Sequence, residues 1–244
     1  MDDLTGAIGT WTSLSDPAVA EIAAAEFDFV VVDTEHTALG LETVADCIRA
    51  VDAGGSQAVV RTPWNDPVRI KRLLDLGPDG LLVPMIDDGD AAYEAVAATR
   101  YPPEGIRGLA AARASDYGRE IGPYVHETHR DLTLIPQVET EAGVENVDDI
   151  ATTEGVDALF VGPADLSAAL GVFGEWTNPV LSEAMETVVD AGDDAGIPVG
   201  TLGVTPEQVR ALGSVGFDYM IAGADTAHLV AGGKRARDAA EDAI

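Results

Sequence analysis

Eight short apolar runs, each separated from the next by an amphipathic segment, constrain the fold of this chain most. Apolar runs of this length are typical of buried strands, and strands that alternate with helices form a parallel sheet. Eight such runs in 244 residues predict a (β/α)8 barrel, with a doubly wound sheet as the alternative. The predicted strands cover residues 6–10, 28–33, 57–61, 80–84, 132–138, 158–162, 198–202 and 219–222.

Capping side chains followed by proline mark three helix starts, at 16–17, 66–67 and 205–206. The longest irregular stretch, 101–130, is predicted to be an ordered loop at an active site or an interface. Because no part of the chain has the composition of a linker, residues 1–244 are expected to form a single barrel domain.

The charge of the chain is strongly acidic, with 43 Asp and Glu against 14 Lys and Arg and a formal net charge of -29. Nucleic acid and anionic membranes should be repelled by such a surface, so neither is expected as a partner. The 46% hydrophobic content argues against disorder. The composition therefore resembles that of folded proteins from salt-loving archaea, in which high salt screens the self-repulsion.

The remaining composition favours a cytoplasmic protein. Cys47 is the only cysteine, which excludes an intramolecular disulfide. No stretch of about twenty apolar residues predicts a membrane span. The acidic start, MDDLTG, lacks the basic and then apolar layout of a signal peptide.

Polar side chains of several kinds follow the predicted strands, and the carboxyl ends of barrel strands are where active sites lie. Because these ends share one rim, the side chains are expected to converge. They are Asp33, Glu35 and His36 after the second strand, Arg61 after the third, Gln137 and Glu139 at the fifth, and Asp165 after the sixth.

Glu139 and Asp165 are hard oxygen donors on adjacent strand ends, and they suit Mg²⁺ or Mn²⁺ with positions left open for a substrate. The alternative is that both acids only cap helices in an acid-rich chain. The segment GPADLS, residues 162–167, also presents backbone N–H groups at a helix start, which suits a bound carboxylate.

Arg61 ends an apolar run and must therefore find an anion, either a substrate carboxylate or enolate or a structural partner such as Asp33 or Glu35. His36 is a candidate general base that Asp33 could orient, or else an ordinary capping histidine. Of the other histidines, His126 and His129 are expected to be solvated. His228 is expected to pack in the apolar C-terminal segment.

Missing motifs argue against several mechanisms. The only lysines, Lys71 and Lys234, lie outside the predicted strands, so a Schiff-base mechanism is not expected. No GxGxxG or GxxxxGK[ST] follows a strand, so no nucleotide cofactor is expected, and no GxSxG nucleophile elbow is present.

Long motifs in the chain resemble the HpcH/HpaI aldolase family, the metal-dependent class II aldolases of 2-oxo acids. The similarity runs over about residues 11–225. It implies a barrel of the phosphoenolpyruvate/pyruvate-domain type, and a homohexamer built as a trimer of dimers with the C-terminal helix exchanged between subunits. The matching motifs are VVDTEH, VVRTPWNDPVRIKRLLDLG, LLVPM, ATRYPPEGIRG, QVET and EGVDALFVGPADLSAALG.

The resemblance implies roles for residues at matching positions. Glu139 and Asp165 would bind a divalent metal, Mg²⁺ or Mn²⁺ with Co²⁺ as a further candidate, which would chelate a 2-oxo acid. Arg61 would stabilise the developing negative oxygen. Gln137 would line the site, and the backbone at Gly162, Pro163 and Ala164 would hold the substrate carboxylate.

The same resemblance implies that His36, helped by Asp33, handles the proton of the substrate hydroxyl. Asp75 matches a residue that reaches this histidine from a neighbouring subunit. Trp11, and the loop near Arg113 and Ser115, would face the variable end of the substrate. Metal and arginine together would supply the electron sink that a retro-aldol cleavage needs.

The implied reaction is reversible cleavage of a 4-hydroxy-2-oxo acid to pyruvate and an aldehyde. A 2-keto-3-deoxy sugar acid, such as the glucarate or rhamnonate derivative, is the favoured substrate, and a hydroxy-oxo-dioate is the second. A malyl- or citramalyl-CoA lyase is the enzymatic alternative, but the chain offers few basic groups for the CoA phosphates. A barrel that serves only as a binding or scaffold protein is the non-enzymatic alternative.

Overall fold

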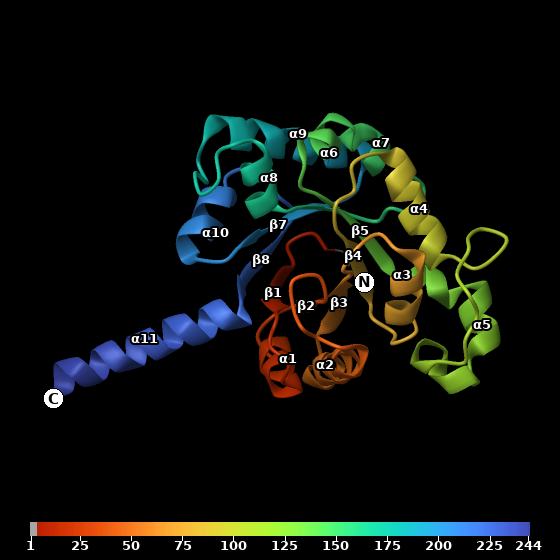
Figure 1. Ribbon diagram of the computed structural model, residues 1–244, viewed down its shortest axis with the longest axis horizontal. Helices are drawn as coiled ribbons and strands as arrows, with labels where there is room; N and C mark the ends of the chain where they lie inside the picture. The colour runs from red at the N-terminus through yellow and green to blue at the C-terminus, as the bar shows by residue number, and fades with distance from the viewer. Residues whose placement is uncertain (1–3) are drawn as a thin grey trace.

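The structure, a computed structural model, describes residues 4–244 and forms a closed barrel of eight parallel strands in the order β1 to β8 (Figure 1). The first three residues of the acidic start lie outside the described residues. Closure of the sheet confirms the predicted (β/α)8 barrel and excludes the doubly wound alternative. The strands are β1 (Ile8–Thr12), β2 (Phe29–Asp33), β3 (Gln57–Arg61), β4 (Gly80–Val83), β5 (Thr133–Val138), β6 (Leu159–Val161), β7 (Val199–Gly203) and β8 (Tyr219–Ala224).

Alternation along each strand divides the core into two layers. On β2, Phe29 and Val31 pack inside the barrel, whereas Val30 and Val32 pack against the surrounding helices. The next inward position of this strand is Asp33, and parallel pairing places it beside Arg61 of β3. Strand alternation therefore brings a carboxylate and a guanidinium together above the apolar interior.

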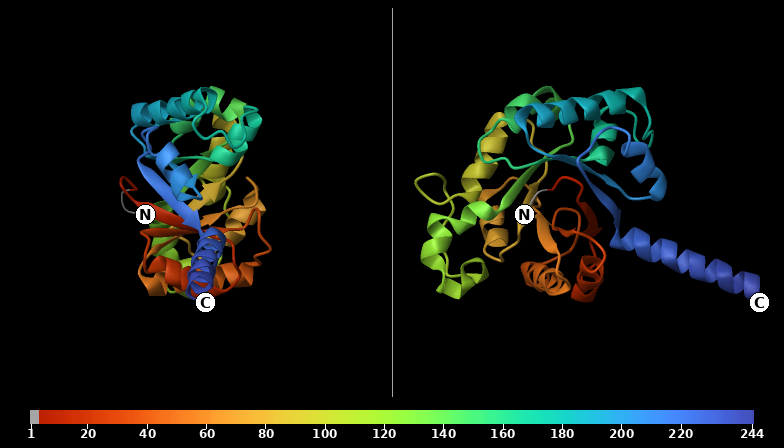
Figure 2. Two further views of the ribbon diagram at one scale, coloured as in Figure 1. Left: turned by 90° about the vertical axis from the view of Figure 1, so that its left-hand side faces the viewer. Right: turned by 180° about the vertical axis from the view of Figure 1, so that it is seen from behind.

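Helices surround the barrel (Figures 1 and 2). The predicted caps are confirmed: the side chains of Asp16, Asp66 and Thr205 accept hydrogen bonds from backbone N–H groups in the first turns of α1, α3 and α10. The helices between strands are α1 (Pro17–Ala24), α2 (Leu41–Gly54), α3 (Pro67–Leu74), α4 (Gly89–Thr99), α6 (Glu141–Glu145), α7 (Val147–Ala151), α8 (Pro163–Ala169), α9 (Pro179–Ala195) and α10 (Pro206–Leu212).

The stretch 101–130 contains more regular structure than the sequence predicts. It carries the 3-10 helices η1 (Arg113–Gly118) and η2 (Thr128–Asp131) with α5 (Ile121–His126) between them. The expectation that His129 is solvated is wrong: its side chain is only 3% exposed and packs edge-on against the ring of Tyr101. This polar segment therefore contributes to a small cluster of rings formed by Tyr101, Tyr124 and His129.

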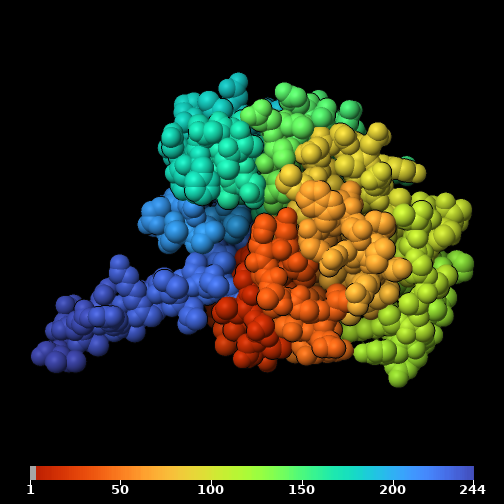
Figure 3. Space-filling model, in the orientation of Figure 1, coloured from red at the N-terminus to blue at the C-terminus, as the bar shows by residue number. Residues whose placement is uncertain are grey.

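Helix α11 (Asp225–Ala243) projects away from the barrel as a single arm (Figures 1 and 2). The space-filling view shows the arm leaving the body next to α1 (Figure 3). His228 near its base is exposed, which corrects the expectation that it packs in an apolar segment, although its ring stacks at 6.1 Å from Phe27. No helix within residues 4–244 is long and apolar enough to cross a membrane.

Candidate active site

Arg61 is the centre of a buried ionic cluster at the carboxyl ends of β2 and β3. Its Nε and Nη2 atoms each donate a hydrogen bond of 2.8 Å to an oxygen of Asp33. Its Nη1 atom lies 2.7 Å from Oε2 of Glu35. Because the arginine is only 7% exposed, this set of contacts fixes the guanidinium plane firmly.

The local chain geometry explains how the cluster forms. The backbone N–H of Glu35 donates to Oδ1 of Asp33 at 3.0 Å, which turns the chain back over the strand end. Below the guanidinium, the buried ring of Trp11 lies with its centroid 4.5 Å from Cζ of Arg61. Trp11 on β1 thus packs against the guanidinium of Arg61. This contact is separate from the role that the resemblance implies for Trp11, which is to face the variable end of the substrate.

His36 lies next to this cluster and is open to solvent, with 68% of its side chain exposed. Its Nε2 atom is 3.8 Å from Oε1 of Glu35. In the described residues the carboxylate of Asp33 contacts Arg61 and the backbone N–H of Glu35, and its backbone carbonyl accepts from Oγ1 of Thr37, so the carboxylate beside His36 is Glu35. The sequence indicated that this carboxylate could pair with Arg61 but not that it also lies beside the histidine.

Glu139 is a second buried carboxylate at the same rim, directly after β5. Its Oε1 atom accepts a hydrogen bond of 2.9 Å from the backbone N–H of Met85, whose φ of 57° lies in the left-handed region. Its Oε2 atom accepts a hydrogen bond from Nε2 of Gln137. A Cβ added to Gly162, the N-cap of α8, would lie 2.7 Å from both of these side-chain atoms, so a larger residue there would displace Gln137 or Glu139.

Glu139 is in a poor environment for an uncompensated negative charge. Burial, together with the charges of Asp165 and Glu35, raises the pKa of its carboxyl group to about 7 against the lowering effect of the two hydrogen bonds. Burial likewise raises the pKa of Glu35, mainly against the attraction of Arg61. Glu35 has Arg61 as its positive partner, whereas Glu139 has no cationic partner within residues 4–244 and would gain from a positive group supplied from outside the chain.

The donor atoms at this point fit a divalent metal ion. Oε1 of Gln137 is buried and has no hydrogen-bond partner within residues 4–244. Asp165 lies exposed in the first turn of α8, close enough to raise the pKa of Glu139. In the part of the chain that the structure describes, no group of three or more His, Cys, Asp or Glu side chains could hold a metal. Two carboxylates with open positions are what Mg²⁺ or Mn²⁺ accepts.

Of the other residues that the sequence suggested, three lie at this rim and Asp75 does not. Pro163 and Ala164 begin α8 beside Asp165, with Gly162 as the N-cap. Asp75 is the C-cap of α3, which leads into β4, so it lies toward the opposite end of the barrel. There it pairs with Arg107, whose Nη2 lies 3.3 Å from Oδ1 of Asp75.

Comparisons with known proteins show the family of this chain. A family model described as HpcH/HpaI aldolase/citrate lyase matches residues 7–231. The chain belongs to this family. It is 38% identical over 219 residues to the 5-keto-4-deoxy-D-glucarate aldolase of Shigella dysenteriae, covering 89% of this chain and 86% of that protein.

Solved structures of the HpcH/HpaI family have the same fold. A family protein from Burkholderia cenocepacia is 36% identical, with a TM-score of 0.92 over 98% of this chain and 96% of that one. An HpcH/HpaI aldolase from Desulfitobacterium hafniense is 27% identical, with a TM-score of 0.86 over 97% of this chain and 93% of that one. The chain is accordingly a carbon–carbon lyase of the aldolase class.

Proposed function

We propose that this aldolase cleaves a 4-hydroxy-2-oxo sugar acid of the 5-keto-4-deoxyglucarate type to pyruvate and an aldehyde, and catalyses the reverse condensation. The observation that carries the proposal is the meeting of two features at one barrel rim. One is a buried carboxylate, Glu139, whose pKa is raised to about 7 mainly by burial and which has no cationic partner within residues 4–244. The other is a buried guanidinium, Arg61, held rigidly by Asp33.

A divalent metal is the cofactor that fits the residues, and Mg²⁺ and Mn²⁺ are proposed ahead of Co²⁺. Glu139 and Asp165 would hold it. When bound, the ion would supply Lewis acidity at the keto oxygen of the substrate. Gln137, which donates to Glu139, orients that carboxylate, and its Oε1, which has no hydrogen-bond partner within residues 4–244, would accept a hydrogen bond from a substrate hydroxyl.

The protein's own groups account for the proton and the charge. Nε2 of His36 would take the proton of the C4 hydroxyl group while the C3–C4 bond breaks and C4 becomes an aldehyde. The electron pair of that bond passes into the enolate of pyruvate. Arg61 would stabilise the negative oxygen of this enolate, which is then protonated at C3 to give pyruvate.

The contact of Glu35 with Arg61 gives this carboxylate a part in the reaction. Oε2 of Glu35 forms an ion pair with Nη1 of Arg61 at 2.7 Å without hydrogen-bond geometry, and Oε1 lies beside His36. An anionic substrate that binds Arg61 would compete with Glu35 for that nitrogen. Glu35, once displaced from Arg61, would be free to stabilise the protonated form of His36. Binding of one substrate at Arg61 would thus also make His36 a better proton acceptor.

The proposal is tested by measuring pyruvate released from 5-keto-4-deoxy-D-glucarate in high KCl with Mn²⁺, Mg²⁺ or EDTA. Metal-dependent release is expected, and Glu139→Gln should abolish it together with the binding of Mn²⁺. The matched control is Glu141→Gln, an exposed acid two residues along the chain. Pyruvate release that is unaffected by EDTA would contradict the assigned metal site.

A lyase acting on malyl- or citramalyl-CoA is the second candidate, because the family description includes citrate lyase. Calorimetric titration with CoA distinguishes the two. Saturable binding of CoA, together with no pyruvate from any free 4-hydroxy-2-oxo acid, would favour the CoA-thioester lyase.

The proposed assembly is a hexamer of three dimers in which α11 is exchanged. Support comes from β8, whose alternate residues remain partly exposed although it lies inside a barrel wall. A groove of about 470 Å³ lies beside it, between α10 and the base of α11, and Val204, Val209 and Ala231 are among its lining residues. A partner's α11 would cover this surface and bury apolar area. In such an assembly Asp75 is proposed to approach a neighbouring subunit's His36.

Light scattering tests this assembly. The full chain is expected to be hexameric, and a chain that ends at Ala224 is expected to lose the dimer contacts. A monomeric full chain at micromolar concentration would contradict the exchange.

A cytoplasmic location at high salt is proposed from the composition. A net charge of -29 destabilises a compact chain through self-repulsion unless salt screens it. The expected result is unfolding when KCl is dialysed away. Full stability without salt would contradict an origin in a salt-loving archaeon.

A further inference from the structure

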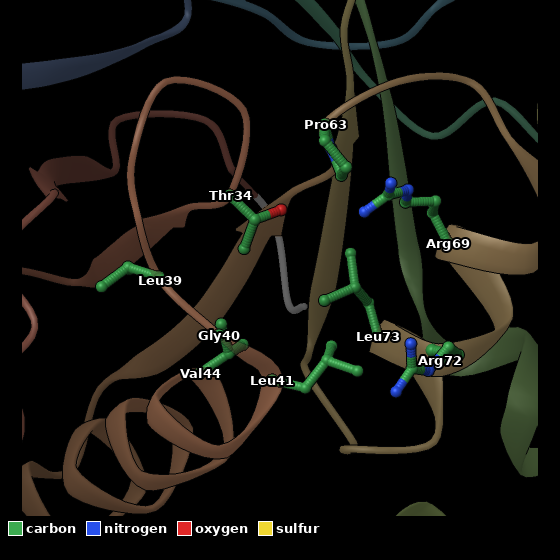
Figure 4. A pocket seen from close by; sticks show the side chains of 9 residues that line it. All are labelled: Thr34, Leu39, Gly40, Leu41, Val44, Pro63, Arg69, Arg72 and Leu73. Carbon is green, nitrogen blue, oxygen red and sulfur yellow. The ribbon is translucent and has the colours of Figure 1, made fainter.

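Trp11 packs against the guanidinium of Arg61 from inside the barrel. It is only 6% exposed, and its ring centroid lies 4.5 Å from Cζ of Arg61. On the outer side of the wall, Oγ1 of Thr34 donates to the carbonyl oxygen of Arg61 at 2.6 Å. Thr34 faces a pocket of about 180 Å³ that neither Trp11 nor Arg61 lines (Figure 4). The backbone of Arg61 is therefore fixed from outside, whereas its charged group depends on the neighbouring carboxylates and on Trp11.

The position of Trp11 depends on how the end of β1 is held. Toward β2 the pairing is regular up to the last residue of the strand. Toward β8 the register shifts, since Gly9 pairs with Ile221 but Trp11 pairs with Ala224, so β8 carries one extra residue here. Gly223, at the shift, has a φ of 87°. Such bulges occur at barrel rims, where they re-aim a side chain. On this side, backbone pairing alone does not fix the end of β1.

Asp225, the first residue of α11, holds the end of β1 just beyond this shift. Its Oδ2 atom accepts hydrogen bonds from Oγ1 of Thr12 at 2.8 Å and from the backbone N–H groups of Ser13 and Leu14 at 2.9 and 2.8 Å. Its Oδ1 atom accepts one from the N–H of Thr226 at 2.6 Å. Asp225 is only 7% exposed, and hydrogen bonds to an ionised carboxylate are stronger than those between neutral groups. Both of its oxygens are therefore needed as acceptors.

His228, in the first turn of α11, makes a second contact with β1. Its Nε2 atom lies 3.4 Å from Oγ1 of Thr10, which donates to the carbonyl oxygen of Gly223 at 3.3 Å. A Cβ added to Gly223 would lie 2.4 Å from Cε1 of His228, so the helix packs directly on the register shift. The start of α11 thus holds β1 at Thr10 and at Thr12, on both sides of Trp11.

We infer that Asp225 is a positioning residue of the reaction: through the end of β1, it keeps the ring of Trp11 against the guanidinium of Arg61. The inference rests on the proposed function for the part of Arg61, which is to stabilise the enolate. If the ring could turn away, the guanidinium would be held less firmly and its charge would be less well oriented as the enolate forms. The start of α11 thereby takes part in the geometry of the active site.

The fluorescence of Trp11 tests the inference without any substrate. In a Trp64→Phe, Trp176→Phe background, Trp11 is the only tryptophan. Asp225→Asn should shift its emission to longer wavelength and increase its quenching by acrylamide, because an amide has one acceptor oxygen and turns N–H donors toward other donors. Asp28→Asn is the matched control, since Oδ2 of Asp28 accepts a backbone hydrogen bond of 2.8 Å from the first residue of β1. It should leave the emission unchanged.

A double-mutant cycle shows whether Asp225 acts through Trp11. In the pyruvate assay, Asp225→Asn should lower kcat by roughly three- to thirtyfold, with a smaller change in KM, because Arg61 acts on the enolate. Trp11→Phe should also lower kcat. In the Trp11→Phe background, Asp225→Asn should change kcat by less than about twofold, since residues that act through one contact are not additive. Asp28→Asn should change kcat by less than about twofold in either background.

The inference would be overturned by unchanged emission of Trp11 in Asp225→Asn, by Trp11→Phe without a loss of kcat, or by an undiminished effect of Asp225→Asn in the Trp11→Phe background. A loss of kcat that light scattering traces to a change in oligomeric state would overturn it as well. If Asp225→Asn does not fold, Thr12→Val removes one of the four hydrogen bonds and should give a smaller shift in emission, and no shift would then overturn the inference. If the wild-type chain released no pyruvate, the proposed function would fail, and the fluorescence comparison would still decide whether Asp225 positions Trp11.

Discussion

Both carboxylate oxygens of Asp33 face the same guanidinium, with Nε and Nη2 of Arg61 each 2.8 Å away. The two residues are register partners on β2 and β3, and both are almost fully buried. A bidentate pair in such a place fixes the plane of the arginine as well as its charge. The positive group at the proposed enolate position is therefore already oriented before a substrate binds.

Asp33→Asn should impair both stability and catalysis. The substitution leaves two donors of Arg61 facing a neutral amide, and breaking a buried pair typically costs 3–5 kcal/mol. We expect about 3 kcal/mol, near the lower end of that range, because Glu35 still contacts Nη1. Chemical denaturation gives the stability, and kcat should fall by at least about tenfold in the pyruvate assay.

Asp46→Asn is the matched control, since it removes one partner of an exposed arginine pair on α2. Its free energy of unfolding should change by less than about 1 kcal/mol. If Asp33→Asn behaved like Asp46→Asn, the Asp33–Arg61 pair would have no organising role.

Gly162→Ala should disturb the proposed metal site while keeping the barrel. The added methyl group would lie 2.7 Å from Oε2 of Glu139 and from Nε2 of Gln137, so one of these side chains must move. We expect at least about a tenfold loss of Mn²⁺ affinity, measured by calorimetry, as for other changes around metal ligands. Gly122→Ala is the control, because a Cβ there would meet no atom within 4 Å. Unchanged Mn²⁺ affinity in Gly162→Ala would contradict the role of Glu139.

The fold could be predicted from the sequence because its signals are local and repeated. The eight apolar runs and the three cap–proline pairs lie where the structure has strands and helix starts. The residues at the strand ends follow from the same alternation, which explains why Asp33, Arg61 and Glu139 could be named.

What the sequence did not predict depends on contacts between distant segments. The two-sided position of Glu35, between Arg61 and His36, depends on how the chain turns after β2. The hydrogen bond from Met85 to Glu139 spans 54 residues. Burial of His129 results from packing against Tyr101, which no periodicity in a polar segment could predict.

Glu139 gives the protein a pH dependence that can be measured in EDTA. Its pKa of about 7 lies above the ordinary value of 4.5, so its stabilising contribution is present below pH 4.5 and is lost as the pH rises through about 7. The difference in unfolding free energy between Glu139→Gln and the wild type should therefore increase across this range, by up to about 3 kcal/mol. Added Mn²⁺ should reverse the trend for the wild type alone.

Glu141→Gln serves as the control, since this exposed acid should titrate similarly in the folded and unfolded chain. Denaturation curves at pH 5, 6, 7 and 8 would provide the comparison. A constant difference between wild type and Glu139→Gln over this range would show that the buried carboxyl group ionises at its ordinary pKa.

His129 should make the segment 101–131 sensitive to acid. Burial lowers its pKa below the ordinary value of 6.5, and the charges of Arg130, Arg100 and Arg107 act in the same direction against the contact with the carbonyl oxygen of Tyr124. The unfolded chain therefore takes up a proton first as the pH falls below 6.5, and stability decreases there by at most about 1.4 kcal/mol per pH unit.

His129→Asn, whose amide can replace the donor to Tyr124, should remove this acid-sensitive component, whereas His126→Asn on the exposed face of α5 should retain it. Hydrogen exchange of the segment between pH 7 and 5 measures the effect locally, apart from the many carboxylates that titrate elsewhere. Protection that falls equally in wild type and His129→Asn would mean that another group controls the acid response. Protection that persists only in His129→Asn would identify the buried imidazole as the group that couples this segment to pH.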